Sequence, residues 1–255
     1  MIDPGDPESW PEDVRSAVED LVRRCRNVKD NEADTASYDL RLEYVDAVFD
    51  VEREFRELVG SRRVALYHAT RLLAHEQDAV RMEGLVVLDE DHRSRRLDRV
   101  IDLYGDEIGA ERLEGLRRAG PLSWDRAHRQ GRLGRLFAVT PLQETFDDAG
   151  SGMTVFLENW GGESFYWAAR DSEELAEIIR LLTARSTPII VELAVEPAWL
   201  DRLTGLWQVF VGRLGEWPRA CQVFSLACSV PPDRIVRLLD PSSEGWPNLR
   251  DSGGG

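Results

Sequence analysis

Lysine is almost absent from this sequence: Lys29 is the only one among 32 basic residues, and the others are all arginine. A phosphate-binding loop of the GxxxxGK[ST] type therefore cannot occur. The dinucleotide pattern GxGxxG and the hydrolase pattern GxSxG are also absent. If the protein handles a nucleotide, it does so with another kind of fold.

Cysteine is equally scarce. Cys25, Cys221 and Cys228 are odd in number and lack CxxC spacing, which argues against a secreted disulfide framework and favours a reducing cytoplasm. Neither HExxH nor HxH occurs, so we expect no metal site. There is no run of 18 apolar residues and no basic, apolar leader at the N-terminus. The sequence predicts a cytoplasmic protein with no membrane span and no membrane partner.

The charge of the chain is strongly negative. Forty-seven acidic residues and 32 basic ones give a formal net charge of −15 over 255 residues. Such a surface repels a long polyanion, which argues against a general nucleic-acid coat protein. The arginine-rich stretches HRSRRLDR and RAHRQGRLGR are places where a local basic surface could lie, although we favour an ordinary solvated helix and loop.

The hydrophobic pattern divides the chain into three parts. In residues 1–60, apolar residues at helical spacing predict one helix from Val14 to about Arg26 and a second from Tyr38 to Leu58. Residues 61–240 mix strand and helix patterns and form the expected catalytic domain. Residues 241–255 have few apolar anchors, and we expect a disordered tail.

The central part alternates irregularly between the two patterns. We expect helices over LLAHEQDAVRMEG, over much of residues 89–132 as an insertion lying on a sheet, and over SEELAEIIRLLTA with Ser172 as N-cap. Strands are predicted for VALYH, GLVVL, LFAVT, PIIVELAV, WQVFV, CQVFSLAC and RIVRLL. Short strands outside a strict alternation with helices predict the α+β class.

Two segments could carry chemistry. His68 ends the expected strand VALYH and precedes two small residues, whereas the other three histidines lie among charged residues and are expected to be exposed. A histidine satisfied in the core explains His68 equally well. The second segment is ENWGGESFYW, in which Gly161 and Gly162 allow close approach of a ligand and Tyr166 offers a ring for a flat heteroaromatic group.

In chain order, His68 in YHAT, Tyr166 in GGESFYWA and Gln222 in QVFSLACSVPPDRI resemble the three signature strands of the ADP-ribosyltransferase fold, in its diphtheria-toxin and poly(ADP-ribose) polymerase branch. That branch has His-Gly-Ser/Thr, then a Gly-rich turn running into Tyr-Phe-Ala, then a strand beginning with Glu. The resemblance covers residues 64–239. It implies a split mixed β-sheet core, with the N-terminal helices outside it.

The resemblance also implies NAD as a substrate. His68 would bind the adenosine-side ribose, the backbone of Ala69 the nicotinamide amide, and Thr70 would assist through its hydroxyl. Tyr166 would stack on the nicotinamide ring, and Arg71 would approach the pyrophosphate. The implied activity is NAD-dependent mono-ADP-ribosyl transfer, a glycosyltransferase reaction, in a bacterial toxin, effector or defence enzyme.

Gln222 departs from the family, because it stands where a glutamate is expected. An amide can position a ribose hydroxyl but offers no charge to the developing oxocarbenium ion. Three alternatives stay open: Gln222 positions the ribose in an active transferase, another carboxylate such as Glu163 supplies the charge, or the fold is inactive.

Other functions also stay open: a silent NAD-binding or interaction module, an RNA 2′-phosphotransferase-like enzyme, or an unrelated α+β domain in which the signature positions are core residues. The acceptor, whether protein or nucleic acid, and the oligomeric state are not determined by the sequence.

Overall fold

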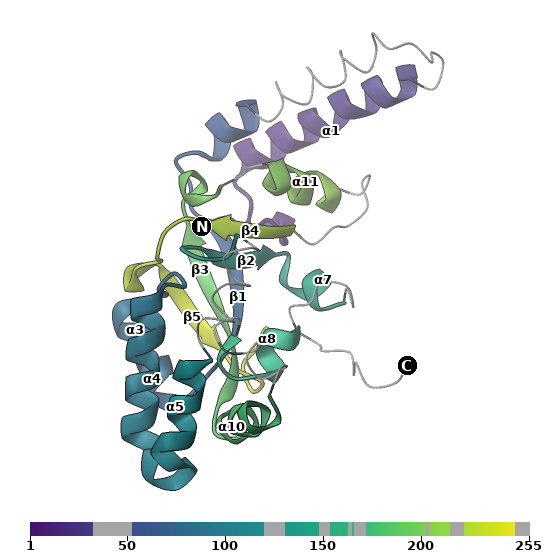
Figure 1. Ribbon diagram of the computed structural model, residues 1–255. Coiled ribbons are helices and arrows are strands. Elements are labelled where there is room, and N and C mark those ends of the chain that lie inside the picture. Colours follow the sequence, from purple (N-terminus) through teal and green to yellow (C-terminus); the bar gives the residue numbers. More distant parts are fainter. Residues whose placement is uncertain are drawn as a thin grey trace.

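The computed structural model is an α+β protein (Figure 1). It describes residues 1–32, 53–119, 131–147, 154–162, 165, 172–201, 204–214 and 222–247. A five-stranded open sheet occupies the centre, with helices gathered around both ends of its long strands. Among the described helices, none combines the length and the apolar character needed to cross a membrane.

The sheet is antiparallel throughout. Its strands are β1 (Val64–Leu72), β2 (Leu136–Thr140), β3 (Thr187–Val195), β4 (Gln222–Leu226) and β5 (Ile235–Leu239). They lie in the order β4-β2-β1-β3-β5, and each neighbouring pair is antiparallel. The expected mixed sheet is therefore wrong. The long helical connection from β1 to β2 brings the chain back in the opposite direction instead of crossing over the sheet.

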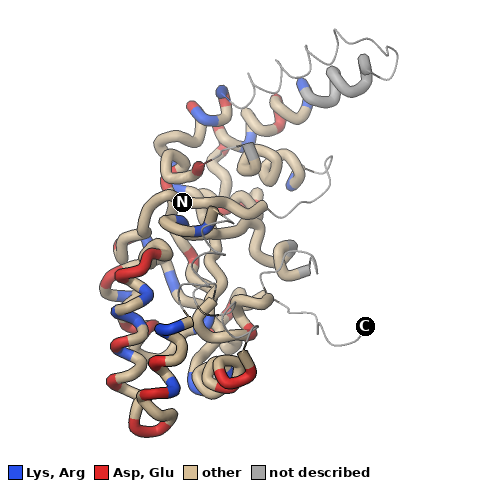
Figure 2. Tube along the Cα trace, viewed as in Figure 1, with Lys and Arg blue, Asp and Glu red and all other residues tan. Residues whose placement is uncertain are grey.

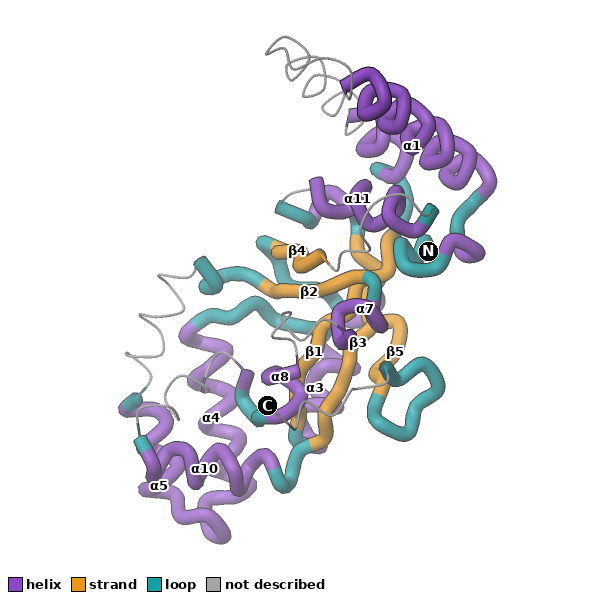
Figure 3. The backbone as a smooth tube through the Cα atoms, turned by 90° about the vertical axis from the view of Figure 1, so that its right-hand side faces the viewer, coloured by secondary structure: helices purple, strands orange, loops and turns teal. Residues whose placement is uncertain are grey.

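The two sides of β1 are paired very differently. Its pairing with β3 runs from Val64↔Val195 to Leu72↔Thr187, whereas its register with β2 consists of the single pair Tyr67↔Val139. Figure 3 shows β2 crossing β1 at a steep angle. Beyond Tyr67 the two strands diverge, and β1 continues to Leu72, past the end at His68 that the sequence indicated.

Two predicted strands are wrong. In GLVVL, only Leu85 forms a bridge, with Val230, because Gly84 turns the chain at φ 87° and the next residues run outside the sheet. WQVFV lies within helix α11 (Thr204–Arg213). Leu206, Trp207 and Phe210 recur on one helical face there and are buried, so the helical period prevails over the β propensity of the segment.

The helices of the central part largely follow the sequence. The expected cap is present, because Ser172 accepts a hydrogen bond from the Leu175 amide. Among the described residues, seven helical segments lie between β1 and β3, of which Gly105–Gly109 is a π-helical turn: α3 (Ala74–Glu83), α4 (Glu90–Tyr104), Gly105–Gly109, α5 (Ala110–Arg118), α7 (Leu142–Asp147), α8 (Thr154–Glu158) and α10 (Glu173–Thr183). Short 3-10 turns lie at Pro7–Ser9, Pro197–Trp199 and Pro232–Arg234.

The helical insertion builds a core of its own. Leu97 and Val100 of α4 and Leu113 of α5 pack in one apolar cluster with Ile178 and Leu182 of α10. No strand residue belongs to that cluster. The insertion therefore lies beside one end of the sheet, against α10, instead of over the sheet as expected (Figure 1).

The N-terminal helices share a core with the sheet. Val14 and Val18 of α1 (Glu12–Glu32) and Phe55 of the helical residues 53–59 belong to the same cluster as α11 and the strands. The ring of Phe210 lies 4.7 Å from that of Trp10 and 5.1 Å from that of Phe55, centroid to centroid. Most of the second predicted N-terminal helix lies outside the described residues.

We expect Phe210→Ala to lower the free energy of unfolding by about 3–5 kcal/mol, since the ring is fully buried between Trp10 and Phe55 and its loss leaves a cavity. Urea denaturation measures the change. Leu103→Ala is the control, because Leu103 is 45% exposed on α4 and its truncation should cost less than about 0.5 kcal/mol. A loss below about 1 kcal/mol for Phe210→Ala would contradict this packing.

Candidate functional site

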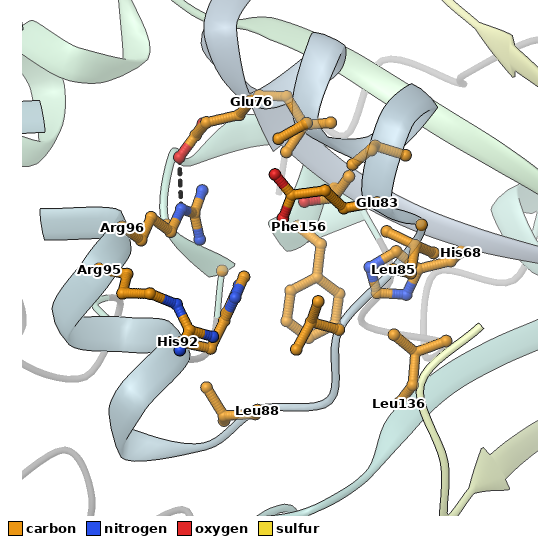
Figure 4. A pocket seen from close by; sticks show the side chains of 18 of the residues that line it. His68, Glu76, Glu83, Leu85, Leu88, His92, Arg95, Arg96, Leu136 and Phe156 are labelled. Carbon is orange, nitrogen blue, oxygen red and sulfur yellow. Dashed lines mark hydrogen bonds and ion pairs between the residues drawn. The ribbon is translucent and has the colours of Figure 1, made fainter. Parts of the chain in front are cut away.

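A cavity of about 620 Å³ opens where β1 and β2 diverge. Its floor is formed by β1 and β2, and its walls come from α3, α4, the segment after α3 and the region around α8 (Figure 4). The residues contributed by the two strands are His68, Ala69, Thr70, Leu72, Leu136 and Phe137. The first of the predicted signature motifs therefore lies in the lining of this cavity.

The imidazole of His68 is fixed by the diverging strand. Its Nδ1 lies 2.7 Å from the carbonyl oxygen of Phe137, and because a carbonyl only accepts, Nδ1–H is the donor. Burial lowers the pKa of His68, which keeps the ring neutral. Its Nε2 is consequently an acceptor, suited to a hydroxyl or amide of a ligand.

Ala69 and Thr70 contribute in different ways. The side chain of Ala69 belongs to the apolar cluster of Tyr67 and Val139, so Ala69 reaches the cavity through its main chain. Thr70 is half-buried and lines the cavity. No strand pairs with this edge of β1 past Tyr67 among the described residues, which leaves backbone groups at Ala69 available to a ligand.

Arg71 does not line the cavity. Its Nε donates to Ser186 Oγ at 2.9 Å, its Nη1 to the Leu157 carbonyl at 2.8 Å and its Nη2 to the Ser186 carbonyl at 3.0 Å. The guanidinium thus ties α8 and the end of α10 to β1. With its donors engaged in this way, Arg71 is not placed to bind a pyrophosphate as the resemblance implied.

Gln222 also points elsewhere. It opens β4 opposite Thr140, and its Nε2 donates to Gln208 Oε1 at 3.4 Å. A Cβ added to Gly205 would lie 2.9 Å from Gln222 Oε1, which shows how closely α11 covers this amide. Gln222 is not among the residues that line the cavity, so the structure does not bring it together with His68. Tyr166 and Glu163 lie outside the described residues.

The glycine pair has two distinct roles. Gly161 has φ 92°, and a Cβ there would lie 2.7 Å from a ring carbon of Phe165, so this glycine is required for packing. Gly162, with φ 50°, faces open space, because a Cβ added there would have Phe156 Cδ1, at 4.0 Å, as its nearest neighbour. Both line the cavity, and only Gly162 leaves room for a ligand.

Phe156, which the sequence did not single out, also reaches the cavity, as do basic residues of the arginine-rich stretch HRSRRLDR, which it did. Figure 4 shows the ring of Phe156 in its centre, between His68 on one side and α4 on the other. His75 and His92, expected to be exposed, are half-buried lining residues, and burial lowers the pKa of each. The side chains from α4 are His92, Arg95, Arg96 and Arg99, whose spacing on a predicted helix was the available signal.

A buried carboxylate fixes the α4 wall. Glu76 Oε2 accepts hydrogen bonds from the Leu73 amide at 2.8 Å and from Trp160 Nε1 at 2.9 Å, while Oε1 pairs with Arg96. The Arg96 guanidinium also lies 4.8 Å from the Trp160 ring centroid. Burial alone would raise the pKa of Glu76, but Arg96 and the hydrogen bonds lower it overall.

Comparisons of the chain with protein-family models, curated proteins and solved structures find no match. Within the described ranges, no three His, Cys, Asp or Glu side chains gather in a way that could hold a metal ion.

We expect Glu76→Gln to lower the free energy of unfolding at pH 7 by about 3 kcal/mol, because it leaves Arg96 without its buried counter-charge. The native pKa lies below the ordinary value, so the stabilisation is present above about pH 4.3 and declines as the pH falls below that value. Urea denaturation at several pH values measures it.

The control is Glu83→Gln, which removes an exposed glutamate that also lines the cavity. A Glu76→Gln deficit that stayed constant down to pH 2.5 would show that the charge of Glu76 is not what holds the wall.

Proposed function

We propose that the protein is an NAD-dependent ADP-ribosyltransferase whose cofactor site is the cavity between β1 and β2. One observation carries the proposal: a neutral, half-buried His68 faces a cavity of about 620 Å³ at the point where two strands separate. That volume suits a ligand of cofactor size.

The sheet order supports the resemblance. The strands with the first and third signature motifs, β1 and β4, flank β2. Tyr166 of the second motif lies outside the described residues, so its place beside these strands stays a prediction.

The cavity offers groups for the nicotinamide ribose. We place this ribose at His68, instead of the adenosine-side ribose that the resemblance implied, because Ala69, the next residue of β1, would bind the nicotinamide amide. His68 Nε2 would accept a ribose hydroxyl, the main chain at Ala69 would bind the carboxamide, and the ring of Phe156 would stack on the nicotinamide. Breaking the bond from nicotinamide to C1′ develops an oxocarbenium ion, which a nucleophile on a protein or nucleic acid then attacks. Nicotinamide leaves with the bonding electrons.

The positive charge of this transition state calls for a carboxylate, and Gln222 does not supply one. Among the acidic side chains of the cavity, Glu76 pairs with Arg96, and Asp78 pairs with Arg81 at 3.1 Å. Glu83 forms no ion pair with a described residue, and Figure 4 shows it among the side chains that line the cavity. We assign to Glu83 the electrostatic support of the developing cation.

We expect His68→Ala to reduce nicotinamide release from NAD by about 100-fold, because it removes the ribose acceptor. The assay is chromatographic detection of nicotinamide together with transfer of labelled ADP-ribose to a lysate. Val223→Ala, on an exposed position of β4, is the control and should match the wild type. If the wild type binds NAD yet releases no more nicotinamide than His68→Ala, the protein is a binding module and the proposed activity is wrong.

For Glu83→Gln we expect kcat to fall by about 10- to 100-fold with KM for NAD changed less than about twofold, since the charge acts on the transition state. Steady-state kinetics of nicotinamide release separate the two constants. Glu57→Gln makes the same charge change on an exposed helical position outside the cavity and should leave both unchanged. An unchanged kcat for Glu83→Gln removes Glu83 from the mechanism.

A further inference from the structure

The charges of α4 are divided between its faces. All of its side chains that line the cavity are basic or imidazole, namely His92, Arg95, Arg96 and Arg99. Its acidic side chains do not line the cavity, namely Glu90, Asp91, Asp98 and Asp102. Because the chain as a whole carries a net charge of −15, a cavity wall of this kind stands out against its surroundings.

One of these arginines is held ready for a ligand. Glu76 and the ring of Trp160 fix the Arg96 guanidinium, and its Nη2 is buried with no hydrogen-bond partner in the described structure. Figure 4 shows the Arg96 side chain extending from α4 toward Phe156. A buried, unpaired N–H group costs free energy, which an oxygen ligand would offset.

Arg95 and Arg99 complete the wall one helical turn apart. Neither forms an ion pair or hydrogen bond with a described residue. Two of the acidic side chains of α3 that line the cavity are engaged, since Glu76 pairs with Arg96 and Asp78 with Arg81, and the third, Glu83, forms no ion pair with a described residue. Arg95 and Arg99 are exposed and line the cavity without a counter-charge among the described residues.

We propose that this wall of α4 binds the diphosphate of a dinucleotide. Guanidinium groups match phosphate oxygens with paired donors, and three of them here converge on one cavity. The inference rests on the proposed function for the rest of the ligand: with the nicotinamide ribose at His68 and Phe156, the diphosphate extends across the cavity to Arg95, Arg96 and Arg99. The helical insertion thus supplies the phosphate contacts that Arg71 does not make.

The test is calorimetric binding of ADP-ribose, ADP and adenosine to the full chain and to the double variant Arg95→Gln/Arg99→Gln. We leave Arg96 unchanged because it is part of the Glu76 pair. The control Arg112→Gln/Arg118→Gln makes the same charge change on α5, outside the cavity. We expect the Arg95/Arg99 variant to bind ADP-ribose and ADP about 10- to 100-fold more weakly and adenosine within about twofold of the wild type, with equal unfolding midpoints.

Unchanged ADP-ribose affinity in the Arg95/Arg99 variant, or no ADP-ribose binding by the wild type, would overturn the inference. So would a variant that binds a 12-nucleotide single strand more weakly but ADP normally, since the wall would then contact a nucleic acid. Nicotinamide release distinguishes the two proposals. ADP-ribose binding that depends on Arg95 and Arg99, without release of nicotinamide, rejects the transferase and supports the diphosphate site. Equal nicotinamide release by the wild type and the Arg95/Arg99 variant supports the transferase and rejects the diphosphate site.

Discussion

The hydrogen bond from the His68 imidazole to the Phe137 carbonyl is the contact on which the site depends. Beyond Tyr67 in β1 and ahead of Val139 in β2, these antiparallel strands separate, and a carbonyl at this point would lose its strand partner. The His68 ring satisfies it from the neighbouring strand. The same contact sets the tautomer of the ring, marks where the sheet opens and places an acceptor at the cavity, so a structural need and a chemical role are met by one side chain.

The α4 wall of the cavity, opposite His68, is held by a buried ion pair. A carboxylate inside the protein is stable only when charge and hydrogen bonds compensate its burial, and Glu76 receives both. In return it fixes Arg96 and Trp160, which belong to segments far apart in the sequence. The helical insertion, with its own apolar core, is thereby locked onto the end of β1.

Much of the fold could be predicted from the sequence. The strands at 64, 136, 187, 222 and 235 and the helices at 74, 90 and 173 follow from local periodicity. The strand predicted for WQVFV is wrong because the burial of Trp207 and Phe210 against α1 is a tertiary effect that a five-residue apolar run does not reveal. The strand predicted for GLVVL is wrong because only Leu85 pairs, with Val230, and the pairing stops there.

The site was predictable only in part. His68 could be found because it lies in an apolar strand next to small residues. The role predicted for Arg71 is wrong because alternation along β1 turns Arg71 to the face opposite Thr70. There it donates to the carbonyls of Leu157 in α8 and Thr183 at the end of α10. The sequence could not show that the basic face of α4 lines a cavity and is not simply solvated, because this depends on which helix packs opposite α4.

The strand order also governs how the chain is assembled during synthesis. The apolar strand β1 is among the first parts of the sheet to leave the ribosome, yet β3, its partner over all nine pairs, follows more than a hundred residues later. Until then β1 has an unpaired edge, and contacts so distant in sequence form slowly. This aggregation-prone strand therefore stays without its main partner while more than a hundred further residues are translated, and the net charge of −15 opposes association between nascent chains.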